Sequence, residues 1–186
     1  MANNRFSDKM RERLTLSFEV FPPKTDAGMS KLPSVLDELG EYHPDYISCT
    51  YGAGGSNIGK NREVLALISE RTEACTHFTC IGLTKDDVRA QLKHYLDDGV
   101  SHILALRGDY PFGWEGTGGD FHHASALVEF IRSEFGDRFE IAVAAAPGGH
   151  VECTSEDNDI AYLKLKQDLG ADYIITQLCY DLEQFK

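Results

Sequence analysis

The sequence predicts an α/β protein, a (βα)8 barrel of the TIM type in which only about six βα units are present. Strand-like runs alternate with helical runs and begin roughly 30 residues apart, as parallel strands with crossover helices require. No GxGxxG turn follows the first strand. Polar residues recur where the predicted strands end, as on the active face of a barrel, whereas an open doubly wound sheet concentrates them at one switch point. These residues are Glu19, Thr50, His77 or Thr79, Arg107 with Asp109, and Gln177, with His150 and Glu152 in the loop after the fifth strand.

The first strand is predicted within Leu14–Lys24, LTLSFEVFPPK, and stops at a double proline, which ends ladder pairing. Two-residue alternation places Glu19 on the face opposite Phe18 and Val20. A carboxylate near the end of a buried strand needs a partner or a task, because burial of an unpaired charge is costly. Position alone leaves two interpretations of Glu19 equally open, a salt-bridge partner and a working acid.

Between residues 30 and 98, apolar spacing predicts three helices and two strands. The helices are expected at Ser30–Tyr42, with Pro33 in its first turn, at Asn61–Thr72 and at Asp86–Asp98. Thr84 with Asp87 three residues later resembles a helix cap. The apolar residues at helical spacing are Leu32, Val35, Leu36 and Leu39, then Val64, Leu65 and Ile68, then Val88, Leu92, Tyr95 and Leu96. Short apolar runs predict strands at Tyr46–Tyr51 and Cys75–Gly82.

The same alternation continues to the end of the chain. Strands are predicted at His102–Asp109, Glu140–Ala146 and Tyr173–Tyr180. Helices are predicted at His122–Phe135, which carries Leu127, Phe130 and Ile131, and at Asp157–Leu169, which Gly170 closes. Asp181–Lys186 is expected to be the first turn of a further helix. Residues 1–13 are expected to be an N-terminal lead-in that frays or forms a short helix, and residues 14–186 a partial barrel domain.

Composition excludes several classes of partner. The net charge of −12 argues against nucleic acid and against an anionic membrane surface. No apolar run approaches the roughly 20 residues that a membrane-spanning helix needs. The five cysteines include no CxxC pair, so buried free thiols are favoured over disulfides or a metal site. An odd number of cysteines without a signal peptide leads us to expect a cytoplasmic location.

Three motifs could carry chemistry, each with a simpler alternative. The glycine-rich loop at residues 52–59, followed by Lys60 and Arg62, could approach a phosphate, or it could be a tight connection. In LRGD, Arg107 and Asp109 are expected to share a strand face, either to bind a ligand or to form an ion pair. His77, considered alone, is more often a core histidine than a ligand. No metal site is expected, because the histidines lack ligand spacing to cysteines or carboxylates.

Seven segments together resemble the methylenetetrahydrofolate reductase family, the flavin-dependent, bacterial-type (βα)8 enzymes of one-carbon and methionine metabolism. They are SFEVFPPK, TYGAGGS, HFTCIGLT, ALRGD, AAAPGGH, DIAYLKLK and GADYIITQ, and they occur in the family's order from about Leu16 to Asp181. The resemblance implies reduction of 5,10-methylenetetrahydrofolate to 5-methyltetrahydrofolate by bound FAD, with NADH or NADPH as co-substrate. The sequence does not distinguish the two nicotinamides.

The resemblance also implies roles for particular residues. Glu19 and Asp109 match catalytic positions, and Glu19, Asp109 and Gln177 match positions that bind the folate. The positions implied for FAD are Thr50, Tyr51, Ala53, His77, Arg107, Gly108, Asp109, Ala124, His150, Asp159 and Lys166.

Three departures from the family pattern affect these expectations. Ala146 and Gly148 stand where the family commonly has an aromatic residue and a glutamate, and Leu165 replaces a basic residue, so FAD binding could be weaker. The last two βα units of the family are absent. We therefore expect a homo-oligomer or completion by the missing units. The alternative function is an accessory flavin- or folate-binding partial barrel that works only with a partner chain.

Overall fold

The computed structural model describes residues 5–51, 58–110, 113, 119–150, 153 and 155–185. Six parallel strands form one sheet in the order β1-β2-β3-β4-β5-β6, so β1 and β6 are its two edges. The sheet is the six-unit part of a barrel, as predicted. The strands are β1 Ser17–Val20, β2 Tyr46–Cys49, β3 Glu73–Thr79, β4 His102–Leu106, β5 Glu140–Ala145 and β6 Tyr173–Thr176.

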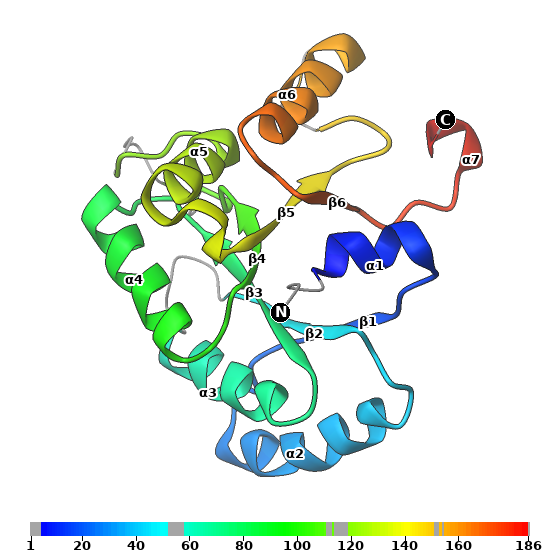
Figure 1. Cartoon of the computed structure of the whole chain (residues 1–186), viewed down its shortest axis with the longest axis vertical. Coiled ribbons are helices and arrows are strands. Elements are labelled where there is room, and N and C mark those ends of the chain that lie inside the picture. The colour runs from blue at the N-terminus through cyan, green and yellow to red at the C-terminus, as the bar shows by residue number, and fades with distance from the viewer. Residues whose placement is uncertain are drawn as a thin grey trace.

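The helices that connect the strands lie in an arc around the outer face of the curved sheet, whereas α1 lies on the inner side (Figure 1). Their bounds are α1 Phe6–Glu12, α2 Asp26–Gly40, α3 Ile58–Ser69, α4 Lys85–Asp97, α5 Ala124–Phe135, α6 Glu156–Asp168 and α7 Leu182–Phe185, with a short 3-10 helix, η2, at Gly136–Arg138. Among the described residues, no helix has the length and apolar character needed to cross a bilayer.

The larger hydrophobic core lies between the outer face of the sheet and the helices. It contains most of the residues that the helical spacing marked, among them Val64, Leu65 and Ile68 of α3 and Val88 and Leu92 of α4, whereas Val35 of α2 is 44% exposed. The expected cap of α4 is confirmed, because Thr84 and Asp87 form a reciprocal capping box. Such local signals require only residues three or four positions apart, so the sequence alone could reveal them.

A second, smaller core lies on the inner face, at the N-terminal ends of the strands. Phe6 of α1 is 3% exposed, and its ring contacts Tyr46, His102 and Tyr173 at centroid distances of 4.7, 5.7 and 5.1 Å. Of the two alternatives for residues 1–13, the short helix is therefore correct over Phe6–Glu12. Helix α1 closes the floor of the partial barrel.

The predicted strand ends were wrong in several places. The first strand begins at Ser17 rather than near Leu14, because its pairing partner begins only at Tyr46, after Pro44, and Leu14 is 97% exposed. Strand β4 ends at Leu106, so the LRGD motif lies in the following loop. Strands β2, β3 and β6 also end before their predicted limits. Apolar residues such as Tyr51, Ile81 and Leu178 occur beyond the point where the ladder stops, so the apolar runs alone do not reveal where pairing ends.

Helix α2 differs from its prediction at the N-terminus. It starts at Asp26, four residues early, because the Thr25 side chain accepts a hydrogen bond from the backbone N–H of Gly28 and caps the helix. Pro33 therefore lies inside the helix and not in its first turn.

Candidate active site at the C-terminal ends of the strands

Parallel pairing brings the C-terminal ends of all six strands to one edge of the sheet, where barrel enzymes place their active sites. Glu19 of β1 and His77 of β3 lie on the inner face, and Oε2 of Glu19 is 3.5 Å from Nε2 of His77. Burial lowers the pKa of His77, and the Glu19 charge opposes that shift only in part. His77 is therefore largely uncharged at neutral pH. The Glu19 side chain is 49% exposed, so both a substrate and solvent can reach it.

The loop after β2 depends on Asn61, which sequence reasoning did not single out. Asn61 is fully buried, and its Nδ2 donates to the carbonyl of Thr50 at 3.1 Å. Its Oδ1 accepts from the Tyr95 hydroxyl at 2.9 Å. A side chain that satisfies both a loop carbonyl and a buried hydroxyl holds the end of β2 in one position. The only sequence signal was a polar residue beside the apolar stripe of α3.

Tyr51, an expected flavin position, sends its side chain away from the inner face. Its ring packs against Phe78 at 5.7 Å, and its hydroxyl donates to Oε1 of Gln91 at 2.7 Å. Burial raises the pKa of the Tyr51 phenol. The side chain of Tyr51 therefore supports the outer layer, and only its backbone is left for a ligand. Ala53 lies outside the described residues.

The LRGD loop is arranged differently from the expected strand. The Arg107 guanidinium lies 4.6 Å from the centroid of the Tyr110 ring, and its Nε donates to the Gly108 carbonyl at 3.1 Å. Gly108 has φ +91°, which an extended strand does not allow, so Arg107 and Asp109 do not share a strand face. Asp109 is exposed at the barrel mouth.

We expect Gly108→Ala to lower the free energy of unfolding by about 1–3 kcal/mol, because any other residue is strained at this φ. A Cβ there would also lie 3.0 Å from side-chain atoms of Thr79 and Ile81. Gly40→Ala is the matched control, since a Cβ at Gly40 meets nothing within 4 Å. Urea unfolding of both variants checks this, and equal stability of the two would contradict the strain argument.

The loop after β5 and helix α6 bring a second group of expected residues together. Nζ of Lys166 donates to the carbonyl of Ala144 at 3.0 Å, and Oδ2 of Asp159 accepts from the backbone N–H of His150 at 3.0 Å. Burial lowers the pKa of Lys166, while the charge of Asp159 acts in the opposite direction. Ala124 is the first residue of the neighbouring helix α5.

A pocket of about 500 Å³ opens between the loops that follow β5 and β6. Its lining includes Gln177, an expected folate-binding residue, together with Ala146 and Gly148. The backbone N–H of Gln177 donates to the carbonyl of Ala145 at 2.8 Å, which fixes the start of the loop after β6. The two departures from the family pattern thus line the same pocket as Gln177, and their small size leaves it wide.

Comparisons with known proteins find relatives along almost the whole chain. The profile of the family described as methylenetetrahydrofolate reductase matches residues 5–186. The 5,10-methylenetetrahydrofolate reductase of Salmonella typhimurium is 38% identical over 186 residues, which is 99% of this chain and 61% of that protein. Methylenetetrahydrofolate reductase 1 of Schizosaccharomyces pombe is 36% identical over 191 residues, 97% of this chain and 32% of that protein.

Solved structures with similar folds are distant in sequence. A 2,3-dimethylmalate lyase of the PEP mutase/isocitrate lyase superfamily has a TM-score of 0.61 at 12% identity, over 96% of this chain and 64% of that one. An oxaloacetate acetylhydrolase has a TM-score of 0.60 at 13% identity, over 93% of this chain and 61% of that one. These likenesses show the fold alone. The chain spans less than two thirds of the length of each of these proteins.

Proposed function

The chain belongs to the methylenetetrahydrofolate reductase family, and from this premise we propose that it forms the catalytic part of an FAD-dependent reductase. The reaction is reduction of 5,10-methylenetetrahydrofolate to 5-methyltetrahydrofolate with NADH or NADPH. The observation that carries the proposal is the pair of Glu19 and His77 on the inner face at the strand ends. A partly exposed carboxylate beside a buried, largely neutral imidazole is suited to moving a proton at a substrate.

The donors around the barrel mouth fit a flavin dinucleotide. Lys166 is a partly buried cation whose ammonium group donates to the Ala144 carbonyl and lies near the charge of Asp159, so an added phosphate would offset its desolvation. Arg107 and the backbone around Gly149, where a Cβ would meet nothing within 4 Å, provide further room and charge. Bound FAD would supply hydride transfer, and the protein would orient it and the folate.

In this proposal Glu19 supplies the proton chemistry. It would protonate the folate nitrogen that leaves as the methylene bridge opens, and His77 would hold the carboxyl group in place through the 3.5 Å contact. Asp109, exposed at the mouth, would accept hydrogen bonds from the pterin ring. Gln177, in the pocket after β6, would contact the folate or the nicotinamide.

We propose that further βα units complete the barrel between β1 and β6 in the active enzyme. Both strands are sheet edges, and the described residues of α6 include none that is buried. Large apolar side chains are exposed on α6, on β6 and after it: Ile160, Tyr162, Leu165, Ile174, Leu178, Tyr180 and Leu182. Covering these side chains and pairing both edges would remove an aggregation hazard as well as close the site.

The two lysines of α6 provide the test of flavin binding. Lys166→Gln is expected to weaken FAD binding by about 10- to 100-fold, the usual worth of a charge-assisted hydrogen bond. Lys164→Gln is the control, because Lys164 is exposed and pairs with Asp168 on the same helix. Flavin absorbance of the purified protein, near 450 nm (about that value for any oxidised flavin), measures the difference. Equal flavin retention by both variants would show that Lys166 does not contribute to flavin binding.

The second candidate function is an accessory flavin- or folate-binding partial barrel. It is favoured by the wide pocket that Ala146 and Gly148 leave and by the open edges of the sheet. Flavin content and folate turnover separate the two candidates. A protein that retains flavin and reduces the folate supports the reductase, whereas one that binds flavin or folate without turnover, even when mixed with the missing units, supports the accessory role.

A further inference from the structure

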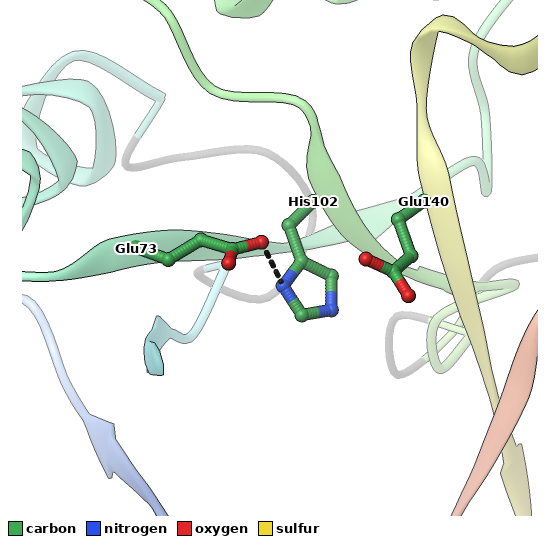
Figure 2. A group of neighbouring side chains, drawn as sticks. All are labelled: Glu73, His102 and Glu140. Carbon is green, nitrogen blue, oxygen red and sulfur yellow. Dashed lines mark ion pairs between the residues drawn. The ribbon is translucent and has the colours of Figure 1, made fainter. Parts of the chain in front are cut away.

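Three ionisable side chains meet at the N-terminal ends of the strands, beside helix α1. Glu73, His102 and Glu140 come from the starts of β3, β4 and β5 and project from the same face of the sheet (Figure 2). The register places His102 directly opposite Glu140. One potential ligand atom from each residue lies within 4.8 Å of the other two. Sequence spacing could not reveal this group, because each residue belongs to a different βα unit.

His102 has one ring nitrogen with a hydrogen-bond partner and one without. The residue is 1% exposed, and Nε2 contacts the hydroxyl of Tyr173. Nδ1 lies 3.1 Å from Oε1 of Glu73, yet it makes no aligned hydrogen bond with any group that the structure describes. When Nε2 carries the proton and donates to Tyr173, a bare Nδ1 lone pair faces a carboxylate oxygen. Two lone pairs at this distance repel each other unless a cation lies between them.

Neighbouring groups hold both carboxylates in place. Oε1 and Oε2 of Glu140 accept hydrogen bonds from the backbone N–H groups of Ser7 and Phe6, respectively. The two backbone N–H groups donate at 2.6 and 2.9 Å. Glu73 is partly exposed, with Nζ of Lys9 at 3.9 Å from its second oxygen. Each carboxylate oxygen retains a lone pair for a further partner.

We propose that Glu73, His102 and Glu140 bind a divalent cation of the Zn²⁺ class at the N-terminal end of the barrel. One imidazole nitrogen and two carboxylate oxygens form a donor set that Zn²⁺ accepts, with each ligand about 2.0–2.2 Å from the metal. Tyr173 would play the outer partner that orients a metal-binding imidazole. A pocket of about 310 Å³, lined by Glu73 and Glu140, gives access from solvent and room for a water as fourth ligand.

The role of this site is structural. The N-terminal face of a barrel serves stability, whereas catalysis takes place at the other face. A bound cation would join the starts of three strands, and through Glu140 it would also hold the first residues of α1. The proposal is therefore independent of the proposed reductase function.

The test is Zn²⁺ binding by the full chain after removal of metals with a chelator. Isothermal titration is expected to give one tight site in the wild-type chain. Glu73→Gln, an isosteric change at a partly exposed position, is expected to weaken that site at least about 10-fold, since even outer partners of a metal site are worth 10- to 100-fold in affinity. Asp137→Asn is the matched control, because Asp137 lines the same pocket but contributes no ligand atom to the group.

Equal affinity of the wild type and Glu73→Gln would place the Zn²⁺ elsewhere and overturn the proposal. Failure of the wild type to bind Zn²⁺ would also overturn it and would leave a proton as the bridge between His102 and Glu73. Should Glu73→Gln fail to fold, the absorption spectrum of Co²⁺ bound to the wild-type chain replaces that comparison. A spectrum with nitrogen and oxygen ligands supports the site, and sulfur charge-transfer bands, from Cys75 or another thiol, contradict it.

Discussion

Glu19→Gln is expected to abolish reduction of 5,10-methylenetetrahydrofolate while bound flavin and its reduction by NADH or NADPH remain. The amide has nearly the shape of the carboxyl group but cannot supply a proton, so only the folate half-reaction loses its acid. General acid catalysis contributes about 10²- to 10⁴-fold in rate, and a loss of that size is predicted. The contact with His77 at 3.5 Å can be kept by the amide, so the site should stay folded.

The two half-reactions are measured separately by stopped-flow spectroscopy, with flavin absorbance as the signal. The protein used is the one with its barrel completed. Glu38→Gln, an exposed carboxylate on α2, is the control and should change neither half-reaction. Unchanged folate turnover in Glu19→Gln would show that another group supplies the proton. Loss of both half-reactions would instead assign Glu19 to flavin binding.

Phe6→Ala is expected to lower the free energy of unfolding by about 3–5 kcal/mol, the usual cost of removing a buried phenylalanine ring. Phe6 is 3% exposed and packs against Tyr46, His102 and Tyr173, which belong to three different strands. Its removal would leave a cavity among them, and the adjacent hydrogen bonds from α1 to Glu140 would lose their support. A small domain has a total stability of about 5–15 kcal/mol, so this is a large fraction of it.

Urea unfolding followed by circular dichroism measures the loss. Met10→Ala, in the same helix but 43% exposed, is the control and should change stability by no more than about 0.5 kcal/mol. If both variants were as stable as the wild type, α1 would be a dispensable lead-in. A strong loss in Phe6→Ala alone would make α1 part of the barrel domain.

Much of the fold could be predicted because its signals are local. The apolar spacing of Val64, Leu65 and Ile68 identified α3 without any knowledge of its neighbours. The strand ends could not be predicted in the same way. Leu106 ends β4 because pairing with β3 stops there, and the two-residue spacing of Arg107 and Asp109 fits a strand whether or not a partner strand is present.

The candidate site, like the fold, has features that local sequence predicts and features that depend on contacts between distant residues. The sequence predicted the six-unit parallel architecture, the family, and the C-terminal edge of the sheet as the place of Glu19, His77 and the LRGD motif. Periodicity, caps and motifs are properties of neighbouring residues, and a parallel sheet gathers strand ends at one edge whatever the details. Only the tertiary structure decided which side chains touch. The contact of Glu19 with His77, the support of Thr50 by Asn61 and the meeting of His102 with Glu73 and Glu140 each depend on strand register and helix packing, which join residues that are distant in the chain.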